Sequence, residues 1–207
     1  MTDAAAVDHA HGVEPAETPL TPESWGKLGM WVFLAGDAMS FGTLLAGYAI
    51  MRGNSANWPV PVDVLGISLT AFMTFLLICS SVTMVKGLDA IKNDDQAGLV
   101  KYMWLTVGGG LIFLALQAYE WTHLINVGLH LSANKWGDSL FGTTFYIITG
   151  FHGMHVTGGV IYLAVIAMRG QKGVYSATNW NEVEIAGLYW HFVDLVWILV
   201  FTFIYLL

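Results

Sequence analysis

Long apolar segments alternate with short polar connections along most of this 207-residue chain. A helix that crosses the roughly 30 Å hydrocarbon core of a bilayer needs about 20 mainly apolar residues, because each residue advances the helix by about 1.5 Å. Five segments meet this requirement, and the pattern therefore predicts an all-α integral membrane protein, a bundle of five transmembrane helices. They run from about Leu28 to Met51, Val64 to Val85, Tyr102 to Ile125, Leu140 to Met168 and Ile185 to Leu207. The fourth is longer than a perpendicular span requires, so we expect it to tilt or to project from the bilayer.

The composition agrees with membrane insertion and excludes other classes of protein. Hydrophobic residues make up 56% of the chain and charged residues 11%, whereas an ordinary soluble domain has roughly 25% charged residues. A net charge of -7 argues against nucleic acid as a partner, because phosphates are bound by clustered Lys and Arg. The single cysteine, Cys79, excludes a disulfide within the chain and any Cys-x-x-Cys site.

Charged residues gather outside the apolar segments and predict the topology. Residues 1–26 hold five acidic and no basic residues, so we interpret them as an acidic, mobile arm ahead of a membrane domain of residues 27–207. Cytoplasmic loops are enriched in Lys and Arg. A cytoplasmic N-terminus and a periplasmic C-terminus leave only Arg52 and Lys135 outside. The basic residues then placed on the cytoplasmic side are Lys27, Lys86, Lys92, Lys101, Arg169 and Lys172.

Small residues on the first span predict a face for close helix packing. Ala38, Gly42 and Ala46 recur every four residues, and such a small-xxx-small pattern lets another backbone approach closely within the membrane.

Several polar residues lie inside the predicted spans. An ionised side chain at the bilayer centre costs on the order of 2.5 to 3.5 kcal/mol, so such residues face protein or water. His191 and Asp194 are three residues apart, hence on one helix face, where the imidazole can hydrogen-bond the carboxylate. His152 and His155 have the same spacing. We expect an internal polar cluster from these residues: Asp37, Gln117, Glu120, His152, His155, His191 and Asp194.

Three uses of this cluster stay open. Its members hydrogen-bond one another and fix the helix register, or they handle protons, because His and carboxylates in a low dielectric titrate towards neutral pH. The third use, metal or haem ligation, is disfavoured because only three imidazoles lie deep and no Cys-x-x-Cys-His occurs. We assign no catalytic residue, metal or cofactor to the chain. A free-standing proton-coupled transporter is a further alternative, and the lack of internal repeats argues against it.

Four stretches resemble subunit III of the haem-copper oxygen reductases, the cytochrome c oxidase and quinol oxidase group. They are WVFLAGDAMSF (31–41), LQAYEW (116–121), FGTTFYIITGFHGMHVTGG (141–159) and EIAGLYWHFVDLVWILVF (184–201). They cover four of the five spans in the family's order, and the five spans are similar to the short bacterial form. The chain departs from the family at Asp37, where the family typically has Glu.

The resemblance implies a non-redox accessory subunit in the bacterial cytoplasmic (inner) membrane. Its partners would be subunit I, which carries the haems and copper, and the other oxidase subunits. The resemblance also implies support of proton uptake, protection from inactivation during turnover, and bound phospholipid. Arg169 matches a lipid-contacting arginine of the family, with an ordinary positive-inside anchor as the alternative. The related accessory protein of bacterial nitric oxide reductases is a second candidate.

Overall fold

A computed structural model describes residues 25–207, and within them the chain is helical, with no strand. The elements are α1 (Trp25–Asn54), α2 (Pro61–Val64), α3 (Ile67–Lys92), α4 (Gln96–Val127), α5 (Leu140–Gln171), α6 (Asn181–Val200) and the π-helix η1 (Phe201–Leu206), which continues α6. Five helices in this part of the chain are long and apolar enough to cross a membrane. The predicted all-α protein with five spans is therefore confirmed. The predicted acidic arm lies outside the described residues, except for its last two positions, which begin α1.

The helices are longer than the apolar segments that predicted them. The 32 residues of α5 correspond to about 48 Å of helix, so its ends extend beyond a hydrocarbon core of roughly 30 Å. At its start, α4 gains six residues because Asp95 caps it, accepting a 2.8 Å hydrogen bond from the Gly98 N–H. A hydropathy pattern detects only the apolar middle of each helix. The polar turns at the helix ends belong to the helix as well, but this pattern does not detect them.

The start of the second predicted span needs correction. Val64 belongs to the short helix α2, and Leu65 has an extended backbone, with φ -100° and ψ 144°. The spanning helix α3 begins only at Ile67. The sequence stays mainly apolar from α2 into α3, so hydropathy alone does not detect the break between the two helices.

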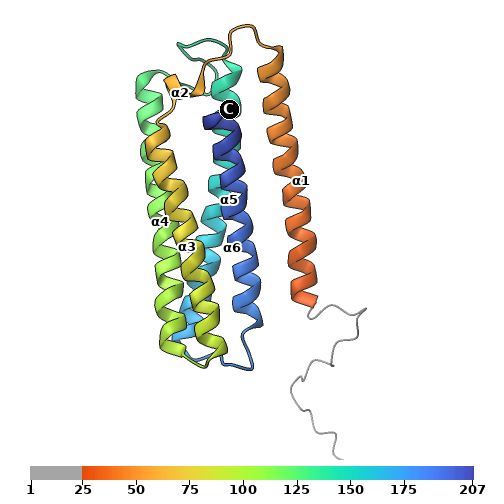
Figure 1. The fold of residues 1–207 in the computed structure, drawn as a ribbon, viewed down its shortest axis with the longest axis vertical. Coiled ribbons are helices and arrows are strands. Elements are labelled where there is room, and N and C mark those ends of the chain that lie inside the picture. The colour runs from red at the N-terminus through yellow and green to blue at the C-terminus, as the bar shows by residue number, and fades with distance from the viewer. Residues whose placement is uncertain (1–24) are drawn as a thin grey trace, which may run out of the picture.

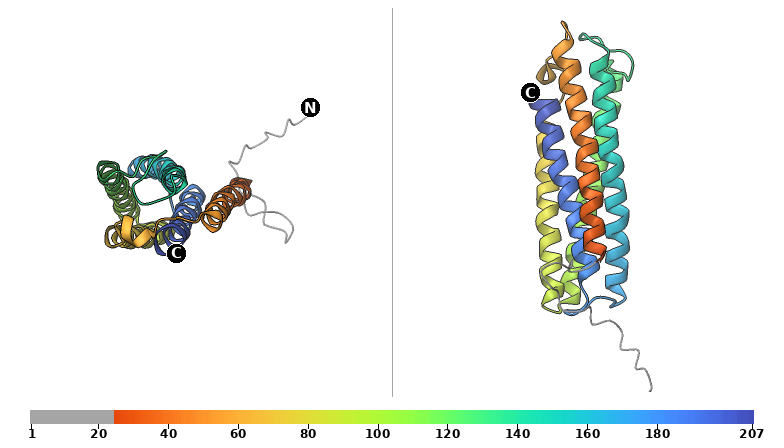
Figure 2. Two further views of the ribbon diagram at one scale, coloured as in Figure 1. Left: turned by 90° about the horizontal axis from the view of Figure 1, so that it is seen from above. Right: turned by 90° about the vertical axis from the view of Figure 1, so that its right-hand side faces the viewer.

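Four helices form the body of the bundle, and α1 stands at its edge. Viewed from above, α3, α4, α5 and α6 surround a common core, while α1 lies outside them beside α6 (Figure 2). Figure 1 shows the same separation along the full length of the helices. The residues that α1 buries form one narrow stripe: Leu34, Phe41, Leu45 and Tyr48.

The small-residue face of α1 is left exposed by the described residues, apart from Ala38, which also lines a cavity shared with α6. Ala38, Gly42 and Ala46 are all exposed, and no described atom lies within 4 Å of a Cβ added at Gly42. The face therefore remains free for a helix of another chain.

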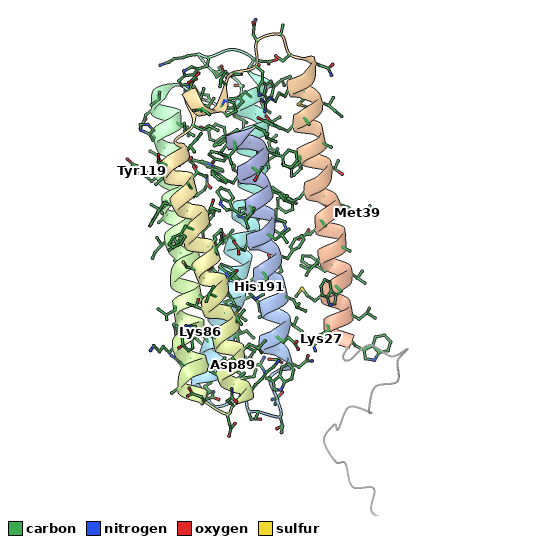
Figure 3. The ribbon with its side chains drawn as sticks, viewed as in Figure 1. Lys27, Met39, Lys86, Asp89, Tyr119 and His191 are labelled. Atoms are coloured by element: carbon green, nitrogen blue, oxygen red, sulfur yellow. The ribbon has the colours of Figure 1, made fainter. Side chains whose placement is uncertain are left out.

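Two of the basic residues that the topology assigns to one side of the membrane lie at the same end of the bundle. Lys27 and Lys86 lie at the end where α1 begins, and Tyr119 lies towards the other end (Figure 3). Which side of the membrane this end faces stays a prediction.

The core is built around Trp190, which fills a slot between two glycines. A Cβ at Gly110 would lie 2.6 Å from Cη2 of Trp190 and 2.5 Å from Cγ2 of Val160. A Cβ at Gly159 would lie 3.0 Å from the same indole. The indole N–H donates to Ser80 Oγ at 3.0 Å. The ring is fixed by this bond, so it is not free to move away from an added side chain.

We predict that Gly110→Val destabilises the bundle, because its side chain would overlap the fixed indole. Overpacking of this kind costs about 1 to 3 kcal/mol, and we expect a lower thermal unfolding midpoint for the purified protein. Gly108→Val is the matched control, since a Cβ at Gly108 meets nothing within 4 Å. Equal midpoints for the two variants would contradict the packing described here.

Candidate functional site: buried polar groups between the helices

Glu120 is the best-connected buried carboxylate. It is 3% exposed, and its Oε1 accepts a 2.9 Å hydrogen bond from Thr70 on α3. Its Oε2 accepts bonds from the Tyr205 hydroxyl at 2.9 Å and from Gln117 Nε2 at 3.2 Å. One side chain of α4 therefore joins α3, α4 and η1 through three hydrogen bonds.

A cavity of about 180 Å³ reaches the Glu120 group from one end of the bundle. Asp63 of α2 and His123 of α4 line it together with Glu120. Polar side chains therefore follow one another from the chain connection before α3 to the buried carboxylate.

A second group joins α6 to α3. Asp194 is 7% exposed, and its Oδ2 accepts a 2.8 Å bond from the Ser81 hydroxyl. The Trp197 indole N–H, one turn further along α6, donates to Thr74 Oγ1 at 2.9 Å. Together with the bond from Trp190 to Ser80, these contacts run along much of the α3 and α6 interface.

The expected hydrogen bond between His191 and Asp194 is not formed. Asp194 turns to Ser81 on α3, whereas His191 lines an apolar cavity of about 390 Å³ between α1 and α6. Residues three apart on a helix differ in direction by about 60°, which here separates two interfaces. His191 therefore belongs to the α1 side of the bundle.

The third group joins α1 to α5. The Oδ2 of Asp37 lies 2.9 Å from Nε2 of His155, and both side chains are largely buried. Nδ1 of His155 lies 2.8 Å from the Phe151 carbonyl oxygen. The ring is not aligned for a straight hydrogen bond to Asp37, so the contact is an ion-pair approach.

The surroundings of His155 place an imidazole beside a carboxylate within the membrane. Nδ1 lies next to the Phe151 carbonyl oxygen, which can only accept a hydrogen bond. Nε2 is the ring nitrogen that faces Asp37, with Oδ2 of the carboxylate 2.9 Å away. Two side chains of a kind that can bind protons are therefore adjacent, one on α1 and one on α5.

His152 is separate from His155 and from the carboxylates. It is fully buried, and its ring packs 4.9 Å from the Trp197 ring and 5.8 Å from the Phe113 ring. Neither ring nitrogen has a hydrogen-bond partner among the described residues. Within residues 25–207, no three His, Cys, Asp or Glu side chains converge as metal ligands do. The predicted polar cluster is thus divided into three groups, with His152 and His191 outside them.

Arg169 holds the connection between α5 and α6. Its guanidinium lies 2.6 Å from Oε2 of Glu182, and the same oxygen accepts a 2.9 Å bond from the Tyr175 hydroxyl. Burial and the adjacent Glu182 carboxylate raise the pKa of Tyr175 well above its usual value. Tyr175 therefore remains a donor to Glu182 throughout the physiological pH range.

The sequence interpretation named the buried acids and Gln117, which donates to Glu120, but it missed the hydroxyl residues that bind these acids. Thr70 and Ser81 lie in the apolar α3, and Tyr205 lies in η1. The available signal was the spacing of hydroxyl residues along α3, since Thr70, Thr74, Ser80 and Ser81 interrupt an otherwise apolar run.

The fold and these groups define a multi-pass α-helical membrane protein whose buried carboxylates join neighbouring helices. A model of the family described as cytochrome c oxidase subunit III matches residues 23–207. The chain belongs to the cytochrome c oxidase subunit III family.

Curated relatives agree with this assignment over most of their length. Cytochrome c oxidase subunit 3 of Alkalihalophilus pseudofirmus is 36% identical, with 99% of this chain and 98% of the relative covered. The subunit 3 of Thermostichus vulcanus is 37% identical, with 99% and 94% covered. That of a Synechocystis species is 42% identical, with 86% and 74% covered. The chain is accordingly an accessory subunit of a terminal oxidase that associates with other oxidase subunits.

We predict that Glu120→Ala destabilises the bundle more than Asp194→Ala. Removing Glu120 leaves the buried Tyr205 hydroxyl and Gln117 amide without an acceptor, whereas Thr70 can still donate to the Gly66 carbonyl, and each unsatisfied buried group costs about 1 to 3 kcal/mol. Removing Asp194 strands only the half-buried Ser81, for which we expect roughly 1 kcal/mol. Thermal unfolding followed by tryptophan fluorescence measures both. Glu120→Gln, which keeps one acceptor oxygen, should fall in between, and the reverse order for the two alanine variants would contradict the assignment.

Proposed function

We propose that this chain is the non-redox accessory subunit of a proton-pumping haem-copper terminal oxidase in a bacterial inner membrane. In this proposal the haems and copper belong to partner subunits, with no cofactor in this chain. Its tasks are to stabilise the catalytic subunit, to support proton uptake and to bind phospholipid. Membership in the family supports the assembly, and the buried polar groups support the finer roles.

The observation that carries the proton-related role is the contact between Asp37 and His155. Their atoms lie 2.9 Å apart, so two side chains of a kind that can bind protons are adjacent within the membrane. The pair lies on α1 and α5, and α1 is the helix that buries least of itself against the rest of the chain. A proton held there is separated from a docked partner by one helix only.

Docking onto other subunits is assigned to the exposed face of α1. Its small residues Ala38, Gly42 and Ala46 permit the close approach of another helix, and they are unoccupied by described residues of this chain. Helix association in lipid depends on such packing, because apolar surface gains nothing by leaving a lipid environment.

Phospholipid binding is assigned first to Arg169. Its ion pair with Glu182 leaves its side chain 44% exposed, so part of the guanidinium remains open to a phosphate group. The two interpretations of Arg169, as a lipid ligand and as an anchor of its loop, are compatible in this geometry.

Co-purification tests the assignment to a terminal oxidase. We expect a tagged chain, extracted in mild detergent, to bring with it the reduced-minus-oxidised haem spectrum of an oxidase in near-stoichiometric amount. The purified assembly should consume oxygen. Consumption of nitric oxide instead would favour a nitric oxide reductase, and a colourless chain that moves protons alone in liposomes would favour a transporter.

Variants of Asp37 test the proton-related role. Asp37→Asn removes one proton-binding group of the pair, so we expect turnover to decline as pH rises, by roughly threefold, or about 0.65 kcal/mol of barrier. Asp37→Glu, which keeps the carboxylate, should retain turnover. Asp89→Asn removes an exposed acid of α3 and serves as a control for charge alone. Turnover of the oxidase measured against pH checks this, and identical profiles for Asp37→Asn and wild type would contradict the role.

A further inference from the structure

We propose that Lys86 and Lys101, both close to the Tyr102 ring, form a binding site for the headgroup of an anionic phospholipid. The site lies on α3 and α4, at the end of the bundle where α1 begins. Lys86 is seen on the side of the bundle away from α1 (Figure 3). The inference rests on the phospholipid binding in the proposed function and adds a site for it apart from Arg169, but it does not depend on the assignment to an oxidase.

Two lysines that are distant in the sequence come together on one aromatic ring. Lys86 Nζ lies 5.9 Å from the centre of the Tyr102 ring, and Lys101 Nζ lies 5.8 Å from it. These distances are within the range of cation–π attraction. Two ammonium groups therefore lie near the same aromatic ring.

The close packing of α3 and α4 fixes this arrangement. A Cβ at Gly87 would lie 2.5 Å from Cε of Met103 and 3.4 Å from Cβ of Tyr102, so the glycine lets α4 approach α3. One turn deeper, the hydroxyls of Thr83 and Thr106 lie 2.8 Å apart and share a hydrogen bond. The site is therefore built on two rigid, directly bonded helices.

The charges of these two lysines are not neutralised by the described residues. Lys27 pairs with Glu184 at 2.6 Å, and Arg169 pairs with Glu182 at 2.6 Å. Neither Lys86 nor Lys101 has a carboxylate at ion-pair distance within residues 25–207. Asp89 lies one turn after Lys86, but its side chain accepts instead from Asn93 Nδ2 at 3.4 Å. Within residues 25–207, the pair is therefore left without a carboxylate to offset its charge, and an added anion would be attracted to it.

The depth of the site matches that of a lipid headgroup. Val82 lies four residues further into the span than Lys86 and is 52% exposed, and Leu105 is placed likewise relative to Lys101 and is 50% exposed. The two ammoniums therefore mark the boundary between apolar surface and water, where lysine side chains reach out of the hydrocarbon. A lipid bound here would lay its acyl chains along Val82 and Leu105 and its phosphate between the lysines.

The pair of positive charges selects the class of lipid. An anionic headgroup, such as that of phosphatidylglycerol or cardiolipin, is attracted by both lysines. The choline group of a zwitterionic lipid carries its own positive charge and would be repelled. Each lysine near an anionic surface contributes roughly a fivefold preference, so two together select strongly.

The test is retention of lipid by the chain with the subunits it carries. The assembly is exchanged into nanodiscs of equal phosphatidylglycerol and phosphatidylcholine, re-extracted, and its bound lipids are quantified by mass spectrometry. We expect wild type to retain phosphatidylglycerol preferentially, and the double variant Lys86→Gln/Lys101→Gln to lower that ratio by at least roughly fivefold. Lys86→Arg/Lys101→Arg should preserve the ratio. Lys92→Gln is the matched control, since Lys92 lies at the same end but over the ring of Trp180, at 4.1 Å.

Several results would overturn the proposal. Wild type without a preference for phosphatidylglycerol would do so even if the double variant fails to fold. An unchanged ratio in the double variant, or an equal loss in Lys92→Gln, would assign the effect to general positive charge. Loss of a protein subunit from the double variant would mean that an acidic partner occupies the site. Displacement of the lipid by inorganic phosphate would mean that the site binds a soluble phosphate.

Discussion

The absence of water inside a bilayer is the constraint on which this structure depends. A polar side chain within the hydrocarbon must find its partner in the protein, and Glu120 finds three, on α3, α4 and η1. These bonds have direction, unlike apolar contacts, so they define which helices meet and at what height. The bonds from α6 to the hydroxyls of α3 act in the same way. The four-helix body is thus held in register by polar groups that have no alternative partner in lipid.

The helix α1 is attached by a different balance of interactions. It contributes one narrow apolar stripe to the core, and its polar contacts involve charges, Asp37 with His155 and Lys27 with Glu184. Both of these contacts join two ionisable side chains, whereas the bonds of α3 join a hydroxyl to a carboxylate or to an indole N–H. The helix that buries least of itself is therefore attached through paired ionisable groups. It also presents the face of small residues that no described part of the chain covers.

Much of this fold was predictable from sequence because membrane thickness imposes a length that can be read along the chain. The same lengths predicted how deep in the membrane the polar residues lie. The hydroxyl partners of Asp194 and Glu120 could not be predicted in this way, because Ser81 lies 113 positions from Asp194 and Tyr205 lies 85 positions from Glu120. Only packing of the helices shows which hydroxyl meets which acid. The pairing of His191 with Asp194 was wrong for the same reason, since local spacing suggested a contact that the neighbouring helices redirect.

The Asp at position 37 shows why a site is better judged by contact than by motif. Its side chain is one methylene shorter than the Glu typical of the resembling motif, yet its carboxylate still lies 2.9 Å from His155. The helix pair accommodates the difference, because α1 is not locked to α5 by a set of directional bonds. What the position preserves is a carboxylate beside an imidazole whose other nitrogen is committed to the Phe151 carbonyl. That arrangement, not the length of the acid, is what places a carboxylate and an imidazole next to each other within the membrane.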